Sequence, residues 1–310
     1  MKNVSIVVLA LLSLVLLCLF LYLFVGYVCY KTVFSSKRKV RKVKEKIEED
    51  IESEQDKLDW WAKRPFEAIT IESHDGLKLC GHFLKADSNK LVILVHGYGS
   101  SYTEMYNYAK MFEKRGYNIL AVECRAHGAS EGNMIGMGWL DRLDLLSWIQ
   151  CMLLQNLAFR IVLFGVSMGG ATVCMTLGEK LPNNIVCAIS DCAFDNVYRQ
   201  VSYLKAQTFH ITPKLMMRVF NDYMKRTHNY DMRAADGVKA LKKASVPVMF
   251  VHGEADKFVP TEMVYRLAEA VPEGRKELYV VPEASHAASF QTNPKEYERR
   301  VDKFLCKYGM

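Results

Sequence analysis

Several patterns that mark well-known protein classes are missing from this chain. None of its nine cysteines is spaced like the ligands of a zinc finger, and no Cys-x-x-Cys pair, glycine-rich phosphate loop or internal repeat occurs. We therefore expect neither a metal nor an organic cofactor. An odd number of thiols, scattered singly through apolar segments, is typical of a protein in a reducing compartment.

Basic charge is scarce outside the first 46 residues. The net charge of the chain is +7, but residues 1–46 hold nine Lys or Arg and one Glu, so residues 47–310 carry −1. A nearly neutral body argues against a nucleic-acid partner. The length of 310 residues and the hydrophobic fraction of 50% are sufficient for a well-buried core.

Charged residues are also absent from Val4 to Tyr30. As a helix this segment would be roughly 40 Å long, against about 30 Å for the hydrocarbon core of a bilayer. We expect residues 1–30 to form a transmembrane anchor, with residues 4–30 in the lipid bilayer. The rival is a cleaved signal peptide, whose apolar core is usually about 7–15 residues long and ends at small residues.

Lys and Arg are concentrated on the C-terminal side of this segment. The positive-inside rule predicts a single-pass membrane protein whose body, residues 62–310, faces the cytoplasm, although long domains can cross a membrane despite such charge. Residues 31–61 are predicted to form a charged spacer helix that ends at Trp60 and Trp61, which pack on the body. Its basic part, Lys37–Lys46, could contact anionic lipid headgroups, or the helix could be a solvated spacer. The apolar residues of the spacer at helical spacing are Val40, Val43, Ile47, Ile51 and Leu58.

Residues 62–310 alternate between apolar strand segments and helical segments. This pattern predicts an α/β fold with a mostly parallel, eight-stranded sheet and helices on both faces. Residues 192–236 contain no clear strand and are predicted to be a helical lid insertion. The predicted strands are 66–71, 77–84, 91–95, 118–122, 161–164, 185–190, 246–251 and 277–281. The predicted helices include 103–115, 140–154 and 294–307.

A Gly-x-Ser-x-Gly turn at Gly165, Ser167 and Gly169 follows the strand 161–164. A serine at this position lies on a sharp strand-to-helix bend, with its hydroxyl exposed and a helix N-terminus behind it. A side chain at either glycine would clash with the neighbouring backbone. Because the pattern also occurs by chance, residues elsewhere in the chain must support it.

Three more predicted strands are followed by residues that can do chemistry. His96-Gly97-Tyr98 follows strand 91–95, Asp256 follows strand 246–251, and His286 follows strand 277–281. The carboxyl ends of parallel strands meet at one edge of a sheet, so these residues should converge on Ser167. A serine nucleophile needs a base and a group that orients the base. We predict His286 as the base and Asp256 as the acid, with Asp191 and Asp195 as alternatives for the acid.

These motifs, in this order, resemble the α/β-hydrolase fold serine hydrolases of the serine aminopeptidase and monoacylglycerol lipase type. The resemblance covers residues 66–307. It includes the turn 123–132, similar to the family's Asp-x-Arg-Gly-His-Gly-x-Ser-x-Gly turn but with Glu123 in place of the Asp and Ala126 in place of the first Gly. In such enzymes the oxyanion hole uses backbone N–H groups. Here these groups would belong to Tyr98 and Met168.

We therefore expect a membrane-anchored serine hydrolase that cleaves an acyl bond of a small-molecule substrate through an acyl-enzyme. Apolar residues in the predicted lid favour a hydrophobic or lipid-like ester, but they fit a plain lid core equally well. An aminopeptidase or thioesterase with the same triad remains an alternative, as does a non-catalytic, membrane-tethered binding module. The apolar lid residues are Tyr203, Leu204, Phe209, Leu215, Met216, Met217, Phe220 and Tyr223.

Overall fold

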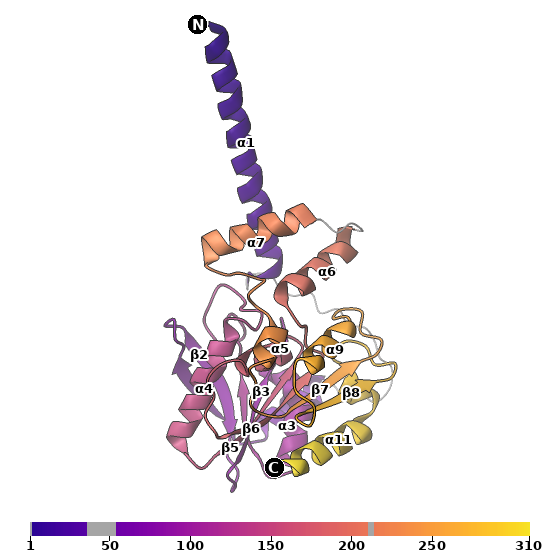
Figure 1. The fold of residues 1–310 in the computed structure, drawn as a ribbon. Helices are drawn as coiled ribbons and strands as arrows, with labels where there is room; N and C mark the ends of the chain where they lie inside the picture. The colour runs from indigo at the N-terminus through magenta and orange to yellow at the C-terminus, as the bar shows by residue number, and fades with distance from the viewer. Residues whose placement is uncertain (1, 36–53, 210–213) are drawn as a thin grey trace.

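The computed structural model describes residues 2–35, 54–209 and 214–310 (Figure 1). Its body is one eight-stranded sheet in the order β1-β2-β4-β3-β5-β6-β7-β8. Strand β2 runs antiparallel to both neighbours, and the pairs from β4 to β8 are all parallel. The predicted α/β class with a mostly parallel sheet is therefore confirmed. The strands are β1 Glu67–Glu72, β2 Lys78–Leu84, β3 Lys90–Val95, β4 Asn118–Val122, β5 Arg160–Val166, β6 Ile185–Asp191, β7 Val248–Gly253 and β8 Lys276–Val281.

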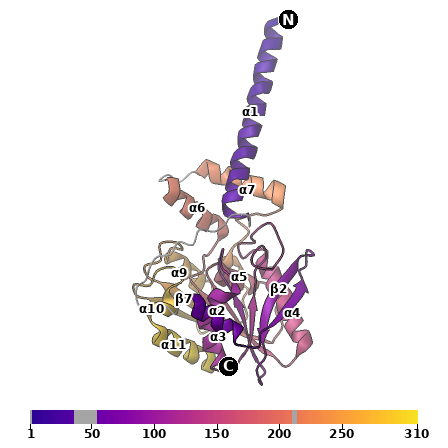
Figure 2. The same cartoon turned by 180° about the vertical axis from the view of Figure 1, so that it is seen from behind.

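Helices cover both faces of the sheet (Figures 1 and 2). The central strands are apolar on both sides, since Val92 and Leu94 of β3 pack in one core cluster and Leu91 and Ile93 in the other. The predicted helix 103–115 begins with a 3-10 turn. On one face lie α2 Glu54–Ala62, η1 Tyr102–Met105, α3 Tyr106–Glu113, α10 Ser289–Thr292 and α11 Pro294–Lys307. On the other lie α4 Asp141–Gln155, α5 Met168–Thr176, α8 Gly237–Leu241 and α9 Glu262–Glu269.

Helices α6 Val197–Phe209 and α7 Lys214–His228 are inserted between β6 and β7, as the sequence predicted. They lie beyond the carboxyl ends of the strands, between the sheet and α1 (Figure 1). Met217 and Phe220 of α7 are buried, so these residues of the apolar set form a packed core. Leu215 is 73% exposed.

Helix α1 spans Lys2–Val33, three residues further than the predicted membrane segment. It is long and apolar enough to cross a membrane, although a signal sequence near an N-terminus meets the same criteria. Residues 36–53, which include most of the predicted spacer and its basic part, lie outside the described residues. Trp60 and Trp61 are buried on the body, as predicted.

The C-terminal end of α1 is built into the body. Phe34, the next residue, is fully buried, and its ring meets those of Phe220 and Tyr230 edge-on. The hydroxyl of Tyr98 donates to the carbonyl oxygen of Val33 over 3.0 Å. The apolar helix therefore ends against the loop that follows β3.

Candidate active site

Ser167 occupies a sharp turn between β5 and α5. Its φ of 57° and ψ of −116° are unfavourable for a residue with a side chain, and its N–H donates to the carbonyl oxygen of Asp191 over 2.8 Å. A Cβ at Gly165 would overlap the backbone of Gly169, and a Cβ at Gly169 would overlap the carbonyl of Val95. The steric reason expected for both glycines is thus present in the fold.

Three side chains from separate strand ends form one hydrogen-bonded line. His286 Nδ1 lies 2.7 Å from Asp256 Oδ2, and His286 Nε2 lies 2.9 Å from Ser167 Oγ. With its proton on Nδ1, the imidazole donates to the carboxylate, and Nε2 accepts from the serine hydroxyl. This is the arrangement a general base needs to take the proton of a nucleophile.

Asp256 is held by contacts that the sequence did not reveal. Its Oδ1 accepts the backbone N–H groups of Phe258 and Val259 at 2.9 and 2.8 Å, and His252 Nε2 lies 3.3 Å from Oδ2. Burial raises the pKa of this carboxyl, but hydrogen bonds from His252 and His286 lower it more, so the pKa falls well below its usual value. The carboxylate is therefore ionised at neutral pH and can stabilise a protonated His286.

The two alternative acids face elsewhere. Asp191 Oδ2 accepts from the hydroxyl of Tyr297 at 2.9 Å, and Asp195 accepts from Arg199 and Arg266. Both carboxylates already have partners on helices that pack around the sheet. Asp256 is thus the carboxylate that the fold brings to His286.

Two backbone segments lie close to Ser167. Met168 is the first residue of α5, and N–H groups in the first turn of a helix have no acceptor within it. The loop after β3 lies close to the serine, since a Cβ at Gly97 would be 3.4 Å from Ser167 Cβ. The N–H of Tyr98 belongs to this loop. The geometry thus places the two predicted oxyanion-hole residues on segments that adjoin the serine.

Two buried histidines hold the loop after β3. His96 Nδ1 lies 2.8 Å from the carbonyl of Gly97, and His127 Nε2 accepts the N–H of Gly99 at 2.9 Å. The other nitrogen of His127 lies 2.9 Å from the carbonyl of Arg125. Burial lowers the pKa of His96 to about 4, so it is neutral at pH 7. These two histidines therefore brace the loop after β3.

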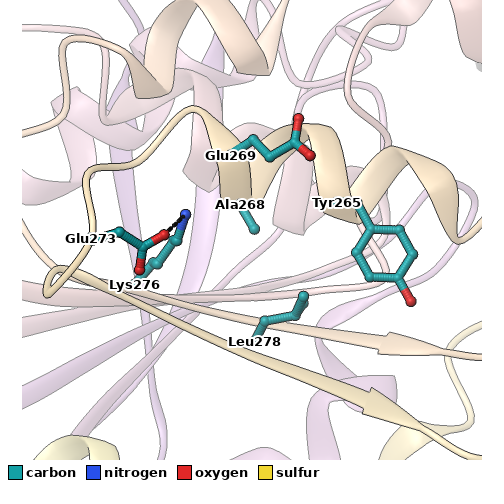
Figure 3. A pocket seen from close by; sticks show the side chains of 6 residues that line it. All are labelled: Tyr265, Ala268, Glu269, Glu273, Lys276 and Leu278. Atoms are coloured by element: carbon teal, nitrogen blue, oxygen red, sulfur yellow. Dashed lines mark ion pairs between the residues drawn. The ribbon is translucent and has the colours of Figure 1, made fainter.

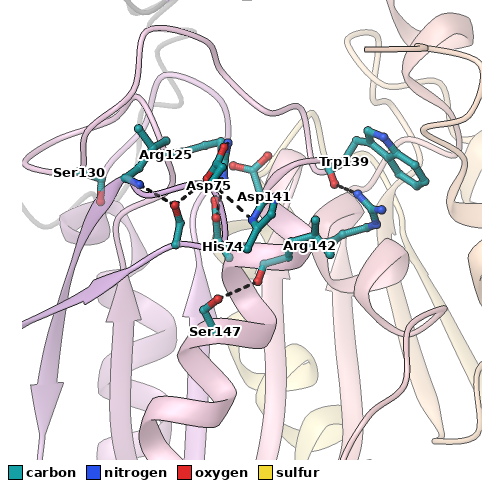
Figure 4. A network of polar contacts seen from close by, with 12 residues as sticks. His74, Asp75, Arg125, Ser130, Trp139, Asp141, Arg142 and Ser147 are labelled. Carbon is teal, nitrogen blue, oxygen red and sulfur yellow. Dashed lines mark hydrogen bonds and ion pairs between the residues drawn. The ribbon is translucent and has the colours of Figure 1, made fainter. Parts of the chain in front are cut away.

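An ion-pair network adjoins the turn after β4 (Figure 4). The buried guanidinium of Arg125 donates to Asp144 at 2.6 Å and to Asp75 at 2.9 Å. The ligand atoms of His74, Asp75 and Asp144 lie within 4.8 Å of one another, as metal ligands can. Because Arg125 already supplies positive charge to both carboxylates, this cluster is explained as a salt-bridge network without a metal ion.

Asp141, labelled in the same network (Figure 4), gives a pH-dependent prediction. Burial, together with the charge of Asp144, raises the pKa of Asp141 to about 6. An unfolded Asp has a pKa of about 3.9, so the folded chain binds more protons between these values and stability falls as pH rises through that window. An asparagine at this position would not titrate in this range. We therefore expect the free energy of unfolding of Asp141→Asn, relative to that of the wild type, to be about 2 kcal/mol higher at pH 8 than at pH 4.5.

Thermal or urea unfolding of both proteins in detergent at the two pH values measures this difference. The comparison uses the change with pH, because the new amide affects packing equally at both pH values. If the variant and the wild type differed in stability by the same amount at pH 4.5 and at pH 8, the pKa of Asp141 would not be raised.

A surface pocket of about 300 Å³ lies between α9 and β8 (Figure 3). An ion pair of 2.6 Å between Lys276 and Glu273 crosses its rim. None of its lining residues belongs to the hydrogen-bonded line at Ser167, so it is not the site of the chemistry. The lining residues are Tyr265, Ala268, Glu269, Glu273, Lys276 and Leu278.

Comparisons with known proteins agree with this fold. The sequence profile of a family described as "Alpha/beta hydrolase family" matches residues 92–300. The uncharacterized protein YqkD of Bacillus subtilis is 26% identical over 272 residues, covering 85% of this chain and 88% of that protein. A 2-hydroxy-6-oxononadienedioate/2-hydroxy-6-oxononatrienedioate hydrolase of Klebsiella pneumoniae is 22% identical, covering 71% of this chain and 88% of that protein.

Solved structures share the fold. The esterase Pf2001 of Pyrococcus furiosus superposes with a TM-score of 0.65 at 24% identity, covering 84% of this chain and 97% of that chain. An acylaminoacyl peptidase of Pyrococcus horikoshii gives a TM-score of 0.57 at 20% identity, covering 80% of this chain but 43% of that longer chain. At these identities the likeness concerns the fold alone.

Proposed function

Because this chain belongs to the alpha/beta hydrolase family, we propose that it is a membrane-anchored serine hydrolase that cleaves a carboxylic ester bond. Ser167 is the nucleophile, His286 the general base and Asp256 the group that orients the base. The observation that carries this proposal is the continuous line of hydrogen bonds, 2.9 Å and 2.7 Å long, that joins the three side chains. A non-catalytic binding module would have no need for this alignment at a strained turn.

The reaction follows from what each group can do. Ser167 Oγ attacks the substrate carbonyl while its proton passes to His286 Nε2, and the N–H groups of Met168 and Tyr98 stabilise the oxyanion. His286 then returns the proton to the leaving alcohol, which departs and leaves an acyl-enzyme on Ser167. Water, deprotonated by the same imidazole, attacks the acyl carbon; the bond to Ser167 Oγ then breaks, and the imidazolium returns its proton to Oγ as the acid leaves. Each oxyanion donor contributes about 10²–10³-fold in rate.

Hydrophobic or lipid-like esters are the proposed substrates. Apolar surface lies close to the serine, since the ring of Phe258, 44% exposed, is centred 4.8 Å from that of His286. The helical insertion and the end of α1 lie on the same side of the body (Figure 1). The structural neighbours include an esterase and a peptidase, so a thioester or an aminoacyl amide is the second candidate. A series of p-nitrophenyl esters of increasing chain length, with a thioester and an aminoacyl p-nitroanilide alongside, ranks these substrates directly.

A fluorophosphonate probe tests the proposed nucleophile. Wild-type protein is expected to be labelled covalently, because the probe reacts with an activated serine, and Ser167→Ala is expected to lose the label. Ser190→Ala is the matched control, since Ser190 is also buried at the end of a neighbouring strand but hydrogen-bonds to Gly170. Well-folded wild type that neither takes the label nor hydrolyses p-nitrophenyl esters would overturn the hydrolase proposal.

We further propose that α1 is a retained anchor and that the body faces the cytoplasm. Retention is supported by the burial of Phe34 and by the hydrogen bond from Tyr98 to Val33, which tie the helix to the body. Charge in the flanking sequence supports the orientation. Cys306 is exposed on the body. A membrane-impermeant maleimide is therefore expected to label Cys306 only after cells are permeabilised, with Cys306→Ser as the control. Labelling of intact cells would reverse the orientation.

A further inference from the structure

Helix α7 lies across the C-terminal part of α1, just above the point where α1 reaches the body (Figures 1 and 2). The hydroxyl of Tyr22 donates to Asp222 Oδ2 over 3.1 Å. Gly26 approaches α7 so closely that a Cβ there would overlap the ring of Tyr223. Contact between the two helices therefore begins at Tyr22 and continues toward the body.

The two sides of α7 differ sharply. Met217, Phe220 and Met224 are buried on the side that faces the core. The opposite side carries side chains that recur every three or four residues and so lie on one face of the helix. We name this set the α7 stripe; it consists of Leu215, Arg218, Asp222, Lys225 and Arg226.

The α7 stripe faces the N-terminal end of α1. Asp222, in the middle of the stripe, bonds to Tyr22, which lies one helical turn N-terminal to Gly26. The side chain of Phe220, on the opposite side of α7, packs on Phe34 at the other end of the contact. The stripe is therefore directed away from the body and along α1.

The length of α1 places the α7 stripe at a membrane surface. The apolar side chains from Ile6 to Leu21 are exposed, and α1 first touches α7 at Tyr22. Residues 2–21 of a helix extend about 30 Å, which matches the hydrocarbon core of a bilayer. If these residues span the membrane, α7 lies at the level of the lipid headgroups.

The α7 stripe has the charge and polarity of a surface that meets anionic lipid. Arg226 pairs with Asp222 at 2.8 Å and Lys225 with Asp231 at 3.2 Å. Arg218 is exposed and has no carboxylate partner among the described residues. Leu215 adds an apolar side chain that is 73% exposed. An amphipathic helix with cations beside an exposed apolar residue is suited to lie in a membrane interface.

We propose that the α7 stripe is a second membrane contact, which rests on anionic lipid headgroups and inserts Leu215 at the interface. This proposal depends on the anchoring by α1 put forward above, and it adds a surface that fixes how the body is oriented toward the bilayer. A single spanning helix would leave the body free to tilt relative to the membrane plane. Contact through α7 would hold the side of the body that carries the insertion against the lipid.

Fluorescence depth measurements on the full chain test this proposal. An environment-sensitive NBD label is attached at position 215 (Leu215→Cys) in protein whose exposed thiols are removed (Cys18→Ser, Cys306→Ser). The protein is reconstituted in phosphatidylcholine vesicles with or without phosphatidylglycerol and with spin-labelled lipid as quencher. Position 154 (Leu154→Cys), 87% exposed at the end of α4, is the control site.

We expect a blue shift and lipid quenching at position 215 but not at position 154. Both effects should be stronger with phosphatidylglycerol and weaker in Arg218→Glu/Arg226→Glu. The matched charge reversal Lys295→Glu/Lys303→Glu on α11, at the far end of the body, should leave them unchanged (Figure 1). Circular dichroism verifies that each variant is folded, independently of the proposed activity.

Three results would overturn the proposal, and each differs from failure of the proposed function. A label at position 215 that is no more quenched than one at position 154 excludes membrane contact by α7. A blue shift without lipid quenching assigns the stripe to a protein partner instead. Equal quenching with and without phosphatidylglycerol excludes selectivity for anionic lipid. If alkaline carbonate extracts the protein from membranes, α1 is not an anchor and the premise of this proposal fails. Ester hydrolysis is measured separately and tests the proposed enzymatic function.

Discussion

Asparagine in place of Asp256 is expected to lower kcat for ester hydrolysis by about 10⁴-fold. The amide can accept from the backbone N–H groups of Phe258 and Val259 as the carboxylate does, so the loop should persist. However, the amide is neutral and favours the wrong tautomer of His286, whose Nε2 then cannot accept the proton of Ser167. The loss should therefore fall on kcat, with little change in KM.

Asp191→Asn is the matched control for this prediction. Asp191 is as deeply buried as Asp256, and its Oδ2 accepts from Tyr297, a bond that an asparagine oxygen retains. We expect Asp191→Asn to keep kcat within a few-fold of the wild type. Steady-state kinetics of p-nitrophenyl ester hydrolysis gives kcat and KM for both variants. Equal losses in the two would mean that Asp256 has no special role in the reaction.

Methionine in place of Arg125 is expected to destabilise the body by about 3–5 kcal/mol. The guanidinium is 3% exposed and is bound to Asp144, itself 6% exposed, as well as to Asp75 (Figure 4). Removing it leaves the charge of Asp144 buried with no cation to offset it, and this unpaired charge accounts for most of the loss. Chemical denaturation of the detergent-solubilised protein, followed by circular dichroism, measures the effect.

Two further variants separate the buried charge from other effects. Arg125→Met/Asp144→Leu removes both members of the buried pair and should recover much of the lost stability. Arg299→Met breaks an ion pair with Glu296 in which the arginine is 62% exposed, and should cost much less stability than Arg125→Met because exposed ion pairs contribute little. If Arg125→Met lost no more stability than Arg299→Met, the ion pairs of Arg125 would contribute no more to stability than an exposed ion pair.

The number of strands and their positions along the chain were predictable because they depend on local sequence. Continuous apolar runs mark strands that are buried on both faces, and each predicted strand appears in the sheet at nearly the predicted bounds. The turn at Ser167 was predictable for a steric reason, since only glycine fits at positions 165 and 169. Convergence of Ser167, Asp256 and His286 followed from the rule that parallel strands end at one edge.

Other features needed the tertiary structure because they depend on which surfaces meet. The sequence favoured Asp256 as the acid and kept Asp191 and Asp195 as alternatives, and the hydrogen-bond partners of each carboxylate in the fold show that Asp256 is the one bonded to His286. The ring of Phe258 beside His286 also had no signal in the sequence. Side-chain contacts between distant segments leave no period or spacing for sequence analysis to detect.

The same division applies to the apolar N-terminal segment. Its length and lack of charge were enough to predict a helix that can cross a bilayer, because both are properties of the segment alone. That its last turns pack on α7 and end at Tyr98 was decided by the fold, which brings residues some 65 to 200 positions apart into contact. The sequence by itself determined the elements and the reactive residues, whereas their spatial arrangement determined how the apolar helix, the insertion and the serine meet.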